Sequence, residues 1–189
     1  MRSIIKKNKT DRTKQIILGV GLVVVMFFSV LGYAFQRDVD DSTQKVIYSG
    51  FEFVNQNGFW FLDMGQFQFA FKYNPRQVER IDSELDYLNK YSGKPLYISS
   101  ESAEAEAEIY RNLFYYPNRI VERMQSACLT DENCGENSPI KTCADNFIII
   151  KESENTEIIQ NESCVFIKGP QQNLTKITDE FLFKILNID

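Results

Sequence analysis

A run of twenty uncharged residues near the N-terminus constrains the fold of this chain more than any other feature. Residues 16–35 read IILGVGLVVVMFFSVLGYAF, which is long enough to cross the roughly 30 Å hydrocarbon core of a bilayer as one helix. Six Lys and Arg residues and one Asp precede the run, whereas QRDVDD follows it. Because positive charge favours the cytoplasmic side, the pattern predicts a cytoplasmic N-terminus and an extracytoplasmic remainder.

Four parts of the chain follow from this interpretation. Residues 1–14 form a basic cytoplasmic tail, 15–35 a transmembrane signal-anchor helix in contact with lipid, 36–45 a linker, and 46–189 one extracytoplasmic domain. The alternative is a signal peptide cleaved at Gly32-Tyr33-Ala34. Twenty apolar residues, however, exceed the roughly 7–15 of a signal-peptide core, so we favour a retained anchor on the cell membrane.

The outer region predicts an α+β fold with antiparallel β-hairpins or a meander and two or three helices. Residues 46–73 predict three strands, with a hairpin turn at Asn57-Gly58 and a second turn at 63–65. Phe67, Phe69 and Phe71 alternate with polar residues, which is typical of a sheet that packs one face on the core. We expect helices over 76–90, 100–116 and 171–187, and strands over 96–99, 119–127, 147–151 and 163–168.

The absence of histidine limits the chemistry that the chain can perform. Histidine is the commonest general base and the commonest zinc ligand, and this chain has none. A net charge of −5 disfavours nucleic acid as a partner. We therefore expect a protein that is not an enzyme and carries no cofactor or metal ion. A surface enzyme, the alternative, would work through carboxylates, for which the candidates are Glu79, Asp82, Asp86 and Asp145.

All four cysteines, Cys128, Cys134, Cys143 and Cys164, fall in the predicted outer region. An even number of cysteines in an oxidising compartment predicts disulfides. Their spacing lacks the CxxC of redox sites and the closely spaced pairs of zinc sites. Three pairings are open. We favour Cys143 with Cys164 and Cys128 with Cys134, because an antiparallel hairpin of 147–151 and 163–168 would place the first two opposite each other.

Several outer residues are candidates for exposed sites. Trp60 could belong to one exposed interaction surface. A second such surface could be formed by the acidic loop between the first two cysteines together with Glu136, which follows that loop. Glu101, Glu104 and Glu108 share one helical face, which we interpret as solvated. The Asn-x-Ser/Thr triplets begin at Asn161 and Asn173, and are candidate glycosylation sites. Asn173 could instead cap the last helix. The acidic residues of the second surface are Asp131, Glu132 and Glu136.

The aromatic hairpin with its Asn-Gly turn, together with the strings KPLYIS, DNFIII, CVFIKG and DEFLFKIL, resembles uncharacterised single-pass membrane-anchored proteins of small-genome archaea. The resemblance implies a membrane anchor and an outer domain, and it carries no activity or catalytic residue. We expect a structural or protein-interaction role at the cell envelope, with an envelope protein as partner. The alternative is an accessory subunit of a membrane secretion or surface-filament complex.

Overall fold

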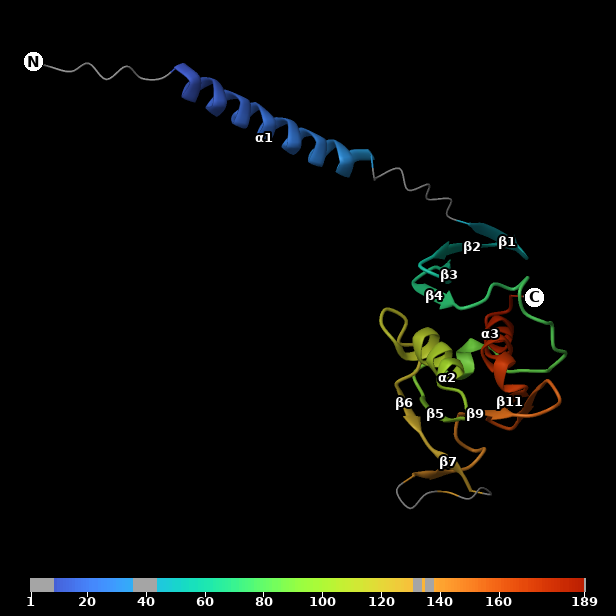
Figure 1. Cartoon of the computed structure of the whole chain (residues 1–189). Coiled ribbons are helices and arrows are strands. Elements are labelled where there is room, and N and C mark those ends of the chain that lie inside the picture. Colours follow the sequence, from blue (N-terminus) through green and yellow to red (C-terminus); the bar gives the residue numbers. More distant parts are fainter. Residues whose placement is uncertain (1–8, 36–43, 131–133, 135–137, 189) are drawn as a thin grey trace, which may run out of the picture. The chain divides into compact units, whose positions relative to one another are not determined.

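The computed structural model describes residues 9–35, 44–130, 134 and 138–188. The chain divides into two compact units, Met1–Ser42 and Thr43–Asp189. In its described part the first unit is one helix, α1 (Lys9–Phe35) (Figure 1). Its large apolar side chains between Ile16 and Phe28 are exposed. None of the helices in the described ranges has the length and hydropathy that a membrane span requires.

The second unit begins with a four-stranded antiparallel meander in the order β1 (Lys45–Tyr48), β2 (Phe51–Gln56), β3 (Phe59–Met64) and β4 (Phe67–Phe71). Asn57 and Gly58 both have positive φ, which confirms the predicted hairpin turn. The sequence predicted three strands here, and the fourth arises because Ser49 and Gly50 also adopt positive φ and turn the chain.

A second, five-stranded sheet has the order β10-β11-β9-β5-β6, and β10 alone is antiparallel to its neighbour. The predicted antiparallel hairpin of 147–151 and 163–168 is wrong, because these segments form parallel neighbours. The chain leaves β9, passes through β10 at the far edge and returns in β11 between them. The strands are β5 (Pro95–Ser100), β6 (Arg123–Ser126), β9 (Phe147–Glu152), β10 (Glu157–Asn161) and β11 (Cys164–Gly169). The short strands β7 (Cys128–Leu129) and β8 (Ile140–Lys141) pair separately.

Within the second unit, helices α2 and α3 lie between the meander and the five-stranded sheet (Figure 1). Helix α2 (Ala103–Ile109) starts at Ser102, whose side chain accepts a hydrogen bond from Ala105 N, and it continues as a π-helix, η2 (Tyr110–Phe114). Helix α3 (Leu174–Ile185) follows a short 3-10 turn, η3 (Gln171–Asn173). The helix expected over 76–90 is wrong except for one 3-10 turn, η1 (Leu88–Lys90), since this segment is otherwise irregular.

Helix α3 is the centre of the core. All of its side chains except Lys176 and Lys184 are buried, as expected for a helix covered on every side. Phe183 lies with its ring centroid 4.6 Å from that of Phe71 and 5.8 Å from that of Phe53, so the meander packs directly on the helix. The described part of the second unit is therefore an α+β domain with an antiparallel meander, as predicted, and a mostly parallel sheet that was not predicted.

Candidate functional site

The structure contradicts the exposed surface expected at Trp60. The Trp60 side chain is only 6% exposed, because it lies on the face of β3 that packs on the core. Phe69 and Phe71 are buried in the same core, which confirms the interpretation of the alternating aromatic face. The acidic candidates Asp131, Glu132 and Glu136 lie outside the described residues.

Exposed tyrosines gather instead on residues 110–119, which we call the 110–119 segment. Tyr110, Tyr115 and Tyr116 are 42%, 57% and 78% exposed. The Tyr110 ring centroid lies 5.3 Å from that of Phe114 and 6.0 Å from that of Tyr115, so these rings form one group. We call Tyr110, Phe114, Tyr115 and Tyr116 the aromatic cluster. Aromatic side chains are enriched among the residues that dominate protein–protein binding, so this group is the candidate functional surface.

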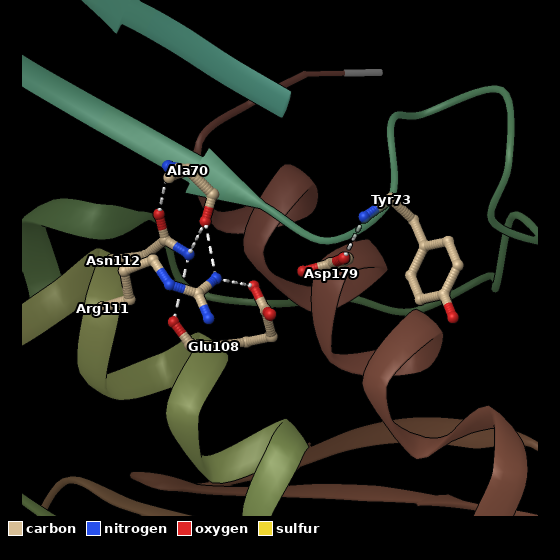
Figure 2. Close-up of polar contacts among 6 residues, drawn as sticks. All are labelled: Ala70, Tyr73, Glu108, Arg111, Asn112 and Asp179. Carbon is tan, nitrogen blue, oxygen red and sulfur yellow. Dashed lines mark hydrogen bonds and ion pairs between the residues drawn. The ribbon is translucent and has the colours of Figure 1, made fainter. Parts of the chain in front are cut away.

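Two buried asparagines attach the 110–119 segment to the free edge of β4. Asn112 accepts a hydrogen bond from Ala70 N at 2.8 Å and donates to Ala70 O at 3.0 Å (Figure 2). Asn118 repeats the arrangement two residues along the strand, accepting from Gln68 N and donating to Gln68 O, each at 2.9 Å. Each side-chain amide thus takes the place of a neighbouring strand residue, and the aromatic cluster is held on a fixed backbone.

Arg111 joins the same edge to helix α2. Its Nη1 donates to the Glu108 carboxylate at 2.7 Å and to Ala70 O at 3.1 Å (Figure 2). The guanidinium carbon also lies 4.3 Å from the centroid of the Phe59 ring, within the range of a cation–π contact. We interpreted Glu101, Glu104 and Glu108 as one solvated face. This interpretation is wrong for Glu108, because that residue is only 2% exposed.

Asp179 of α3 completes this polar region. Its Oδ2 accepts a hydrogen bond from Tyr73 N at 2.8 Å, just beyond the end of β4 (Figure 2). Burial is the largest cause that raises the pKa of Asp179 well above its usual range. The charge of the Glu108 carboxylate is the next largest cause in the same direction. The Tyr73 N–H and the Arg111 charge act in the opposite direction. Buried polar side chains thus join both helices to the meander.

The sequence did carry a signal for this region that pattern reasoning missed. Four aromatic residues occur within 110–116, at positions 110, 114, 115 and 116. Successive residues of a helix are about 100° apart, so these four side chains could not all share the buried face of the expected helix. Nothing comparable identifies Asn112 or Asn118, because an asparagine near the end of a helix is more commonly a cap or turn residue.

The four candidate carboxylates do not converge. Glu79 lines a cavity of about 160 Å³ with Gln77, Lys176 and others. Asp86 accepts from Gln160 Nε2 at 2.6 Å, and Asp145 lies 3.5 Å from Lys141 Nζ. The fourth, Asp82, is exposed. In the described ranges no group of three or more Cys, Asp or Glu side chains is arranged to hold a metal ion.

Both predicted disulfides are present, Cys128–Cys134 and Cys143–Cys164. The pairing is as predicted although its reason was not. Ser163 N donates to Cys143 O, and Phe147 N donates to Ser163 O, so the chain before β9 lies beside the start of β11. Cys143 and Cys164 meet where these parallel strands begin. Two disulfides fit a domain that folds in an oxidising, extracytoplasmic compartment.

Of the two candidate glycosylation sites, Asn161 is exposed at the end of β10 and Asn173 is half-buried at the start of α3. The alternative role of Asn173 as a side-chain cap is wrong, because its side chain makes no capping hydrogen bond. Whether either carries a glycan stays a prediction.

A second polar group lies around Tyr97 on the opposite face of the five-stranded sheet. Arg123 Nη2 donates to the Tyr97 hydroxyl at 3.1 Å, and Lys141 Nζ lies 4.1 Å from the ring centroid. Hydrogen bonding by Lys141 and then by Arg123 lowers the pKa of Tyr97. Lys141 also faces Asp145, so the positive charge here is partly balanced.

Comparison with known proteins finds no matching family model, no matching curated protein and no matching solved structure. The class that the fold and the disulfides define is thus an α+β domain of the oxidised, extracytoplasmic type.

Proposed function

We propose that this protein is a single-pass membrane protein whose outer domain binds an envelope protein through the aromatic cluster. The exposure of that cluster on a firmly attached segment is the observation that carries the proposal. Tyr110, Tyr115 and Tyr116 present large rings to solvent, and Asn112 and Asn118 fix the backbone beneath them. Rings held in place lose little conformational freedom on binding, which favours affinity.

The 110–119 segment also favours a protein as the partner. Tyrosine combines a large apolar surface with a hydroxyl that can exchange water for a partner's polar group. The guanidinium carbon of Arg119 lies 5.9 Å from the Phe114 ring centroid, at the side of the cluster. Tyr and Arg are among the residue types most often responsible for binding energy between proteins.

The anchor that we propose is residues 15–35. Residues 16–35 contain no charge, and the basic residues precede them. The side chains from Ile16 to Phe28 of α1 are apolar around the helix and exposed. A helix that is apolar on every side is normally buried in a protein core or in a membrane. Residues 36–45 would then link the anchor to the outer domain.

Binding through the aromatic cluster can be tested with the full-length protein in its native membranes. A photo-crosslinking amino acid is placed at Tyr115 or Tyr116, and at Tyr87 as a matched control that is 58% exposed elsewhere in the domain. We expect a protein adduct from positions 115 and 116 that is absent from position 87. The triple variant Tyr110→Ser, Tyr115→Ser, Tyr116→Ser should lose co-purification of the same partner. An adduct from position 87 alone, or a partner retained by the triple variant, would refute the proposed surface.

The topology has a separate test. Protease added outside intact cells should remove the domain that contains both disulfides, and thiol reagents should label its cysteines only after reduction. Protection of the domain in intact cells, combined with labelling before reduction, would contradict the proposed orientation. An intact chain recovered from the soluble fraction would contradict the anchor.

A further inference from the structure

The place where α2, α3 and β4 meet contains two buried carboxyl groups. Glu108 is 2% exposed and Asp179 is 0% exposed. One cation, Arg111, ion-pairs with Glu108, its Nη1 lying 2.7 Å from Oε2. Two ionised carboxylates beside a single guanidinium would leave one buried negative charge without a cation, which is unfavourable in a low-dielectric interior.

The hydrogen bonds of Asp179 indicate which carboxyl group is neutral. Oδ2 accepts from Tyr73 N at 2.8 Å. Oδ1 is buried, and no donor reaches it from the described residues. Buried polar atoms in folded proteins almost always have a partner. A proton on Oδ1 turns this oxygen into a donor, and the neighbouring Glu108 carboxylate can accept only hydrogen bonds.

The other groups around Asp179 agree with this arrangement. From α2 and η2 it faces the Glu108 carboxylate and the Arg111 guanidinium, and from the chain after β4 it faces the Tyr73 N–H. On α3 itself the adjacent Glu180 accepts from Ile81 N and lies 4.0 Å from Lys184 Nζ. Glu180 is thus directed to other partners, and the charged groups that act on Asp179 are Glu108 and Arg111.

We propose that Glu108 and Asp179 share one proton, carried on Asp179 Oδ1 and donated to the Glu108 carboxylate, and that this proton fastens the meander to the helices in a pH-sensitive way. Arg111 and Asp179 bond to Ala70 O and Tyr73 N respectively, at the end of β4. Loss of the proton places two negative charges in contact, which weakens the attachment of this end of the strand.

The sign of the pH dependence follows from the raised pKa of Asp179 in the folded state. Between the unfolded pKa, about 3.9, and the folded value, the native state binds more protons than the unfolded chain. The domain is therefore most stable at the acid end of this window, and stability falls as pH rises toward the folded pKa. The unfolding equilibrium constant grows by up to about tenfold per pH unit from this one group.

Urea unfolding of the disulfide-bonded protein, measured from about pH 4 to about pH 8, tests the proposal. The wild type should show the increase with pH, and Asp179→Asn should lose it. The amide can still accept from Tyr73 N and donate to Glu108, so folding should persist. Asp82→Asn, an exposed carboxylate, is the matched control and should keep the wild-type slope. An unchanged slope in Asp179→Asn would overturn the proposal.

A second variant and a direct signal cover the case in which Asp179→Asn does not fold. Glu108→Gln removes the acceptor charge, which is the second cause of the raised pKa of Asp179 after burial, so the pH dependence should weaken and its upper limit should move to lower pH. The C=O infrared band of a protonated carboxylic acid should be present in the wild type at neutral pH and weaker in Glu108→Gln. A wild-type spectrum without that band at neutral pH would refute the shared proton whatever the variants show.

Discussion

Replacing Asn112 by alanine would remove three hydrogen bonds from the attachment between η2 and β4. The side chain accepts from Ala70 N at 2.8 Å and donates to Ala70 O and Glu108 O, each at 3.0 Å. Asn112 is 0% exposed, so water cannot take its place without a rearrangement. The substitution therefore tests whether the amide is the main connection at this edge of the meander.

The expected cost follows from what each partner retains. Ala70 N is left as a buried donor without an acceptor, which costs about 1–3 kcal/mol. Ala70 O keeps the hydrogen bond from Arg111 Nη1 at 3.1 Å, so the loss there is one ordinary bond of about 1 kcal/mol. The bond to Glu108 O contributes a similar amount. We expect a total loss of about 3–5 kcal/mol, a large part of the ~5–15 kcal/mol that stabilises a typical domain.

The assay is urea unfolding with both disulfides intact. Trp60 is the single tryptophan of the chain and is buried, so its fluorescence reports loss of the core. The unfolding midpoint should fall while the m-value stays constant. Asn118→Ala is the matched control, since two of the three groups that it frees belong to exposed Gln68 and only one, Asn112 O, belongs to a buried residue. We expect about 1–2 kcal/mol for the control. A loss below about 1 kcal/mol at Asn112, or an equal loss at both positions, would refute this reasoning.

Three further changes have defined outcomes. Gly169→Ala should lower the free energy of unfolding by about 1–3 kcal/mol, because the new methyl group would collide with Ile177 Cδ1. Adding Ile177→Val should restore part of this loss in urea unfolding. If it restores none, the collision is not the cause. Removing the Cys143–Cys164 disulfide should cost about 3 kcal/mol of stability on chain-entropy grounds, and removing Cys128–Cys134, which closes a shorter loop, about 2 kcal/mol. The reverse order of losses in thermal or urea unfolding would contradict the loop-size argument. Because the pKa of Tyr97 is lowered, its phenolate should form first in an alkaline absorbance titration, and this earliest phase should be missing from Tyr97→Phe. Since the pKa of Tyr97 is lower in the folded than in the unfolded state, this group adds stability as pH rises between the two values.

Local patterns in the sequence predicted the elements whose signal is carried by adjacent residues. The Asn57-Gly58 turn and the helices predicted over 100–116 and 171–187 are of this kind, and each is present. The alternation on β4 likewise identified Phe69 and Phe71 as core residues. In each case the side-chain period or the backbone preference acts over a few residues, so no knowledge of distant partners is needed.

The features that the sequence did not predict depend on partners far along the chain. β9 and β11 are both apolar, and that pattern fits parallel neighbours as well as a hairpin. The parallel arrangement depends on β10, an edge strand between them in the sequence that its weak side-chain pattern did not reveal. Asn112 gives no local sign that its partner is Ala70, 42 residues earlier. The same limit explains the error at Glu108, which faces solvent on an isolated helix and is buried once α3 and β4 pack against it.

The two asparagine attachments have a consequence for how copies of the domain can meet. A strand at the end of a sheet offers free N–H and C=O groups to any extended chain, and this is a common route to aggregation. On β4 the groups of Gln68 and Ala70 are already bonded to Asn118 and Asn112. Strand addition past β4 is therefore blocked at Gln68 and Ala70, so the meander cannot lengthen there.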